Sequence, residues 1–197
     1  MTHTDVVATV DMVALCFHTL INHLNGAHAP TNDLGAMHSA QVGGMFVTWE
    51  TTQGNLRGCI GSLSELPLSR LTDYAIRSSQ QDSRFHPIRM HELPNLACHV
   101  SILHSFENCD TPQSWSVGIH GIIVEFEIHS RSFRATFLPN VMPEQGWSVE
   151  EALKQAARKA GYHGNFAEIK SVIRVTRYQS SKASLTYSEF QRFSRLN

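Results

Sequence analysis

The stretch Leu56-Arg57-Gly58-Cys59-Ile60-Gly61-Ser62 places a cation, a thiol and two glycines within seven residues. It follows a strand-like run, residues 44–50 (GMFVTWE), across a turn-forming segment, residues 51–55. Two such runs around a short segment that contains glycine are typical of a β-hairpin, so we expect them to pair. Gly58 and Gly61 have no side chains, which leaves the backbone open to close approach by a ligand or another strand.

Side chains in an extended segment alternate between the two faces of a strand. We therefore expect Leu56 and Ile60 on one face, and Arg57 and Cys59 on the other, about 6–7 Å apart along the strand.

The remaining chain alternates between helical and strand-like patterns. Helices are predicted at residues 5–25, capped by Asp5 and ending at Gly26, at 67–81 and at 148–161; strands are predicted at 97–103, 115–128, 131–138 and 170–178. Residues 26–43 read as a loop, and residues 185–190 as either a short strand or a helix start. The strands arrive as hairpins rather than as repeated βαβ units, which favours an α+β fold with a mainly antiparallel sheet and flanking helices.

No linker or internal repeat forces a division of the 197 residues, so we expect a single domain, 1–197, or two tightly packed lobes. Sixteen basic against seventeen acidic residues exclude a strongly basic nucleic-acid binder. The net charge is unevenly distributed along the chain: it is −7 over residues 1–128 and +6 over residues 129–197. Such asymmetry indicates an anionic partner, or two parts that pack against each other or are simply solvated.

The four cysteines form no Cys-x-x-Cys pair, and Asp5 and Asp11 interrupt the N-terminal apolar run. We therefore expect no signal peptide, reduced thiols and a cytoplasmic or nuclear location. No run of about 18 apolar residues is present, so we expect no association with a membrane.

Cys59 is a candidate nucleophile, because a nearby guanidinium such as that of Arg57 favours the thiolate. A nucleophile also needs a general base, and His120, bracketed by Gly118 and Gly121, is the candidate. The alternative is that Cys59 is a small packing residue.

Arg57 and Arg84 offer a second hypothesis, in which they form an anion pocket with backbone N–H groups of the glycine-containing stretch. The alternative is that both arginines make structural ion pairs with Asp82, Glu92 or Glu107. The twelve histidines show no metal-ligand spacing, and no nucleotide-binding fingerprint is present, so no metal is expected and no cofactor is indicated.

Several stretches together resemble the AMMECR domain family, named after the chromosomal region of an Alport-syndrome contiguous deletion. The resemblance covers about residues 5–190 and is closest to the eukaryotic branch. It is carried by the hexapeptide Leu56-Arg57-Gly58-Cys59-Ile60-Gly61 and, in the family's order, by residues 44–49, Asp82-Ser83-Arg84-Phe85, Glu92-Leu93-Pro94, residues 117–122, Leu138-Pro139, residues 144–147, Lys159-Ala160-Gly161 and Thr176-Arg177-Tyr178.

The resemblance implies an α+β fold with a larger and a smaller lobe, packed as one unit, and a cleft between them near the hexapeptide. The family has no established biochemical activity, although roles near transcription, replication, repair or translation have been suggested for it. Its prokaryotic relatives are associated with Memo-type proteins and radical-SAM enzymes, which hints at a modification pathway. The resemblance implies that the residues at the family's motif positions are site candidates, without assigned roles: Arg57, Gly58, Cys59, Gly61, Asp82, Arg84 and His120.

Three hypotheses follow for function. The first is a binding or regulatory module whose cleft around residues 56–62 accepts an anionic small molecule or protein segment through Arg57 and Arg84. The second is an enzyme that uses Cys59 with His120 as base. The third is RNA association through the basic C-terminal third, although no stacking motif accompanies it.

Overall fold

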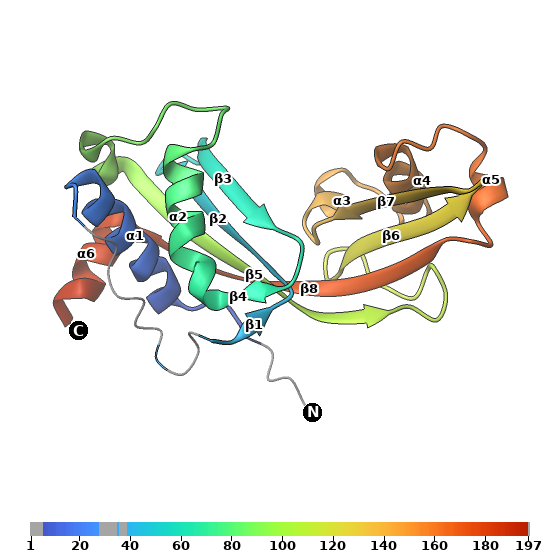
Figure 1. Cartoon of the computed structure of the whole chain (residues 1–197), viewed down its shortest axis with the longest axis horizontal. Coiled ribbons are helices and arrows are strands. Elements are labelled where there is room, and N and C mark those ends of the chain that lie inside the picture. Colours follow the sequence, from blue (N-terminus) through green and yellow to red (C-terminus); the bar gives the residue numbers. More distant parts are fainter. Residues whose placement is uncertain (1–5, 28–34, 36–38, 197) are drawn as a thin grey trace. The chain divides into compact units, whose positions relative to one another are not determined.

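The computed structural model describes residues 6–27, 35 and 39–196 (Figure 1). The chain divides into two compact units. The first unit comprises Met1–His104 and Ser181–Asn197, and the second comprises Ser105–Ser180. Two long strands, β5 (Leu96–Asn108) and β8 (Arg174–Thr186), contribute residues to both units. The α+β class with a mainly antiparallel sheet is confirmed.

The first unit contains the predicted hairpin. Strands β2 (Gly44–Thr51) and β3 (Leu56–Ser62) pair antiparallel, and β2 pairs on its other side with β5. The strand order β3-β2-β5 places β3 at the edge of the sheet. A short second pair, β1 (Gln41–Val42) with β4 (Leu66–Pro67), was not predicted.

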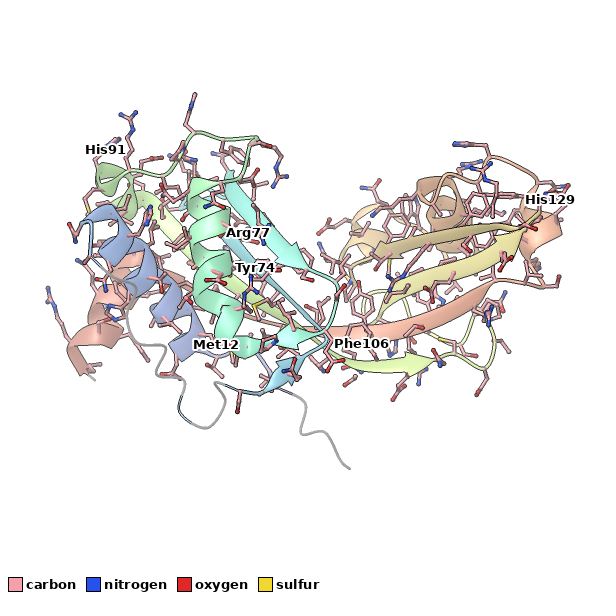
Figure 2. The ribbon with its side chains drawn as sticks, viewed as in Figure 1. Met12, Tyr74, Arg77, His91, Phe106 and His129 are labelled. Atoms are coloured by element: carbon pink, nitrogen blue, oxygen red, sulfur yellow. The ribbon has the colours of Figure 1, made fainter. Side chains whose placement is uncertain are left out.

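The helices of the first unit pack on one face of this sheet. They are α1 (Val10–Leu24), α2 (Leu71–Gln80) and α6 (Tyr187–Leu196), with 3₁₀ turns at Leu68–Arg70 and Met90–Asn95. Phe17 of α1 meets Trp49 of β2 edge to face at 5.2 Å and stacks on Phe190 of α6 at 4.8 Å between ring centroids. Helices α1 and α2 lie side by side (Figure 1). In Figure 2 the labels Tyr74 and Arg77 mark α2, and the label Met12 marks a fully buried residue of α1. The buried face of the sheet is therefore the face of Trp49.

Strand β3 approaches α2 closely at Gly58. A Cβ on Gly58 would collide with the backbone oxygen of Ser78, whose hydroxyl accepts a hydrogen bond from the Trp49 indole N–H at 3.0 Å. Leu56 pairs with Glu50 and Gly58 with Trp49, so Arg57 is an extra residue in a β-bulge. The predicted strict alternation from Leu56 to Ile60 is therefore wrong, because the bulge interrupts the period at Arg57.

The second unit is built on strands β6 (Gly121–Ile128) and β7 (Arg131–Phe137) with part of β8, in the order β8-β6-β7. His129 and Ser130 form the turn between these two strands, and both residues have positive φ angles, 50° and 59°. Helix α4 (Val149–Lys159) begins after Ser148, whose hydroxyl accepts the N–H of Glu151 at 3.2 Å. Short helices α3 (Val141–Glu144) and α5 (Phe166–Ile169) complete the unit.

Most differences from the predicted elements lie at their ends. Helix α1 begins at Val10 with Thr9 as its cap, and the predicted cap, Asp5, lies outside the described residues. Strand β6 begins at Gly121 rather than at residue 115, and β8 continues to Thr186. Among the residues that the structure describes, no helix is both long and apolar enough to cross a lipid bilayer.

We predict that Gly58→Ala lowers the free energy of unfolding by about 1–3 kcal/mol, because the added methyl group has to displace α2 from β3. Urea unfolding of the purified chain measures this change. Ser62→Ala, on the same strand, serves as the control and should change stability by less than about 0.5 kcal/mol. Equal stability of Gly58→Ala and the wild type would show that α2 does not press on the strand at this point.

Candidate functional site

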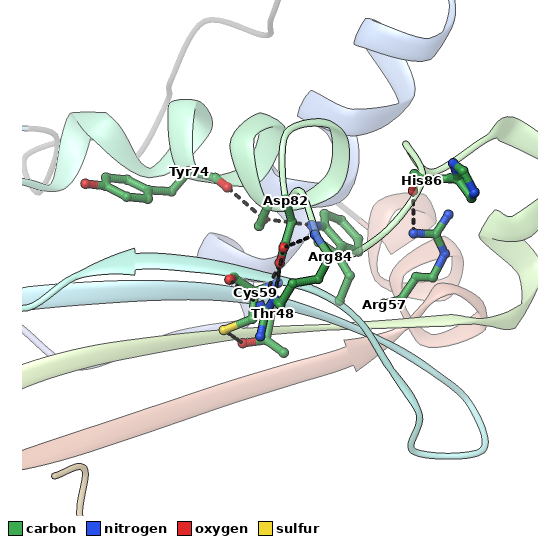
Figure 3. A network of polar contacts seen from close by, with 9 residues as sticks. Thr48, Arg57, Cys59, Tyr74, Asp82, Arg84 and His86 are labelled. Carbon is green, nitrogen blue, oxygen red and sulfur yellow. Dashed lines mark hydrogen bonds and ion pairs between the residues drawn. The ribbon is translucent and has the colours of Figure 1, made fainter. Parts of the chain in front are cut away.

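Cys59 lies at the edge of the sheet, and two side chains bind its backbone (Figure 3). Its N–H donates to Oδ2 of Asp82 at 2.9 Å, and its carbonyl oxygen accepts from Nη2 of Arg84 at 3.1 Å. An edge strand otherwise presents such groups unpaired. Asp82 and Arg84 therefore take the place of a neighbouring strand at this residue.

Asp82 and Arg84 also bind each other. Nε and Nη2 of Arg84 donate to the two carboxylate oxygens of Asp82 at 3.0 and 2.7 Å, and the Arg84 backbone N–H adds a bond of 3.2 Å. The Asp82 side chain is only 7% exposed. The hydrogen bond from Arg84, supported by those from the backbone of Cys59 and Arg84, holds the pKa of Asp82 well below its usual range. The carboxylate in turn raises the pKa of Arg84.

Arg57 is engaged by a neighbouring loop. Its Nε and Nη2 donate to the two carboxylate oxygens of Glu92 at 2.9 and 3.1 Å, and its Nη1 donates to the carbonyl oxygen of His86 at 2.6 Å. Burial raises the pKa of Glu92, but the hydrogen bonds from Arg57 and from the Arg89 backbone outweigh it and leave this pKa below its ordinary value. Arg57 thus fixes the loop that follows Asp82.

A pocket of about 410 Å³ lies where these side chains meet, lined by Arg57, Ser83, Arg84, Phe85 and His86. The Arg84 guanidinium lies over the Phe85 ring, 5.4 Å from its centroid. The Arg84 side chain remains 55% exposed, and its Nη1 has no hydrogen-bond partner among the described residues. The pocket therefore combines an aromatic wall with an available cationic donor.

The Cys59 thiol has polar neighbours that the sequence analysis did not identify. Thr48 donates from Oγ1 to Sγ of Cys59 at 3.1 Å, and Thr48 pairs in register with His99 on its other side. His99 Nε2 lies 3.1 Å from Oε2 of Glu50. The alternation of strand β2 was the available signal, because it places Thr48 and Glu50 on the face opposite Trp49.

His120 lies in the second unit, whereas the other candidate residues lie in the first. Its Nδ1 accepts the backbone N–H of Ser116 at 3.1 Å, and the preceding Gly118 has a φ of 83°. The pairing of Cys59 with His120 remains a prediction. Within the described ranges, no group of three or more His, Cys, Asp or Glu side chains is arranged to hold a metal ion.

Comparisons with known proteins identify relatives along nearly the whole chain. The AMMECR1 family model matches residues 13–183, as the resemblance had indicated. An uncharacterized protein of Arabidopsis thaliana is 40% identical over 191 residues, covering 93% of this chain and 87% of its own. An uncharacterized protein of Schizosaccharomyces pombe is 38% identical over 74% of this chain and 77% of its own. The crystal structure of an uncharacterized protein from Pyrococcus horikoshii matches with a TM-score of 0.67 and 28% identity, covering 88% of this chain and 89% of that one.

We predict that Asp82→Asn lowers the free energy of unfolding by about 1.5–3 kcal/mol at pH 7, because charge-assisted hydrogen bonds to a buried carboxylate are lost. The control is Asp73→Asn, which removes an exposed partner of Arg70 and should cost less than about 1 kcal/mol. Equal losses in the two variants would contradict a special role for Asp82.

The effect of Asp82 should depend on pH in a defined direction. Because its pKa is lowered in the folded protein, its ionic contribution is fully present above about pH 4, the ordinary pKa of an unfolded aspartate. That contribution is lost as the pH falls toward the lower pKa of the folded state. The difference between wild type and Asp82→Asn should therefore shrink below about pH 4.

Proposed function

The chain belongs to the AMMECR1 family, and from this premise and the pocket in its first unit we propose that it is a binding or regulatory module for an anionic small molecule or protein segment. The observation that carries the proposal is the half-exposed side chain of Arg84 in the pocket wall. We further propose a cytoplasmic or nuclear location, in keeping with four free thiols.

Arg84 is suited to an anion because its position is already fixed. Asp82 holds Nε and Nη2, while the two N–H groups of Nη1 remain for a ligand. A donor that is ordered before binding loses little conformational entropy when the ligand arrives. Ser83 and His86 are further polar residues of the pocket lining.

Arg57 was expected to contact the anion directly, but its side chain has other partners in the structure. Its side chain is only 16% exposed, and its guanidinium is bonded to Glu92 and to the His86 carbonyl. In the proposed site Arg57 holds the loop that forms the pocket wall, and Arg84 makes the contact with the anion. Gly58 and Gly61 contribute by the close packing of β3, since a Cβ at either position would collide with backbone atoms.

Thermal unfolding with inorganic phosphate, pyrophosphate or an acidic peptide as probes tests this proposal. We expect at least one probe to raise the Tm of the wild type, since a ligand present at 100 times its Kd stabilises the folded state by about 2.7 kcal/mol. Arg84→Gln should abolish the increase, and Ser83→Ala, which leaves the ion pair with Asp82 intact, should reduce it.

Each variant is compared with its own ligand-free Tm, so that a loss of stability alone is not scored as a loss of binding. Arg70→Gln is the matched control, because Arg70 also pairs with an aspartate but lies outside the pocket. No increase with any probe, or an undiminished increase in Arg84→Gln, would overturn the proposal.

A further inference from the structure

The two arginines of the pocket in the first unit each have a carboxylate partner of their own. Arg57 pairs with Glu92 at 2.9 Å, and Arg84 pairs with Asp82 at 2.7 Å. Both carboxylates are ionised at neutral pH, since an ordinary carboxyl pKa is about 4 and an arginine partner favours the charged form. The two cations and the two anions cancel, and His86, the other ionisable residue of the lining, is formally neutral at pH 7. The charged groups around the pocket therefore leave no net positive charge.

Most of the strong hydrogen-bond donors at this site already have partners within the protein. Every guanidinium nitrogen of Arg57 donates to Glu92 or to a backbone carbonyl oxygen (Figure 3). The backbone N–H groups of Cys59 and Arg84 both donate to Asp82. The carboxylate of Asp82 is thus the anion that these clustered donors hold. The guanidinium nitrogen that has no partner among the described residues is Nη1 of Arg84.

These two features disfavour a phosphate group as the ligand. Proteins hold phosphate, which carries close to two negative charges at neutral pH, with several cationic side chains or with clustered backbone N–H groups. One available nitrogen in surroundings without net charge offers neither. A carboxylate carries a single charge, and one of its oxygens can accept a hydrogen bond from Nη1 of Arg84. The electrostatics of the site therefore favour a carboxylate.

Phe85 gives the pocket an apolar wall. Its side chain is half-buried, and the Arg84 guanidinium covers its ring at 5.4 Å from the centroid. Ligand pockets combine apolar surface with a few polar groups that fix the orientation of the ligand, and they span about 300–1,000 Å³. The volume of about 410 Å³ is within this range and exceeds what a carboxylate group alone would fill. Phe85 is therefore placed to contact the body of a ligand whose carboxylate binds Arg84.

We propose that the pocket selects a carboxylate attached to an apolar group and discriminates against phosphates. The inference rests on the proposed function, because it names the class of anion that Arg84 binds. The same chemistry occurs in a free aryl or alkyl acid and at the C-terminus of a peptide that ends in an apolar residue.

Phenylacetate and phenyl phosphate, two probes with the same ring, test the selection in NMR titrations of the whole chain at constant ionic strength. At about pH 7.5 phenyl phosphate is mostly a dianion, because the second pKa of a phosphate monoester is about 6. We expect phenylacetate to bind about tenfold or more tightly than phenyl phosphate. Acetate, which lacks the ring, and phenylacetamide, which lacks the charge, should both bind more weakly than phenylacetate.

A tripeptide of two glycines and a C-terminal phenylalanine separates the two sources of the ligand. If the tripeptide binds more tightly than phenylacetate and its C-terminal amide does not bind, the proposal is supported with a protein C-terminus as the source. Tighter binding of phenylacetate supports it with a free acid as the source. Equal binding of the tripeptide and its amide would overturn the proposal, because the carboxylate would then contribute nothing.

Two substitutions separate the effect of charge from that of the apolar wall. Glu92→Gln removes one negative charge, so phenyl phosphate should gain about threefold or more in affinity relative to phenylacetate. Phe85→Ala should weaken the binding of phenylacetate and leave that of acetate unchanged. Glu125→Gln is the matched control, because Glu125 also pairs with an arginine, Arg134, but lies in the second unit. The control should keep the wild-type ratio of affinities.

The selection and the proposed function fail in different ways. If phenyl phosphate binds as tightly as phenylacetate and Arg84→Gln abolishes both, the selection is overturned while anion binding by Arg84 stands. An unchanged ratio of affinities in a folded Glu92→Gln variant would also overturn the selection. Binding of neither probe would do the same, whereas the proposed function fails only if inorganic phosphate, pyrophosphate and the acidic peptide fail as well.

Discussion

The carboxylate of Asp82 accepts hydrogen bonds from the backbone of Cys59, from the backbone of Arg84 and from two nitrogens of the Arg84 side chain. Charge-assisted bonds of this kind are roughly twice as strong as neutral ones. Here they act on the edge of a sheet, where a strand otherwise exposes its backbone to other chains. Two side chains from the loop after α2 thus complete the pairing of β3 and fix Cys59 on the strand.

Both sides of the candidate site depend on this constraint. On the loop side, the bond to Asp82 orients the guanidinium of Arg84 toward the pocket while leaving its Nη1 available. On the sheet side, the fixed backbone holds the thiol of Cys59 against Thr48. Cys59 therefore lies between the pocket lined by Arg84 and the paired positions that run through Thr48 to His99.

Local patterns predicted much of the fold. The alternation of β2 and the turn after it predicted the hairpin, and the helix predicted at residues 148–161 corresponds to α4. The bulge at Arg57 could not be read from the sequence, because it results from the register between two strands. The short pair of β1 with β4 depends likewise on a contact between segments far apart along the chain.

The candidate site was predicted less completely than the fold. The residue patterns and the family resemblance together identified Arg57, Cys59, Asp82 and Arg84. They did not reveal that Asp82 and Arg84 bind the backbone of Cys59. Thr48 and His99 were missed because the alternation of β2 gives the face of Thr48 but not the register that places it beside Cys59 and His99. The ion pairs that were the alternative to an anion pocket are present, between Arg57 and Glu92 and between Arg84 and Asp82. The pairing of Arg84 nevertheless leaves part of its side chain exposed.

Hydrogen exchange at the backbone amide of Cys59 tests most directly whether Asp82 replaces a neighbouring strand. The account predicts that this amide exchanges as slowly as the amides of the central strand β2, and that Asp82→Asn makes it exchange far faster while the amides of β2 stay protected. Fast exchange of the Cys59 amide in the wild type, or unchanged protection in Asp82→Asn, would contradict the account.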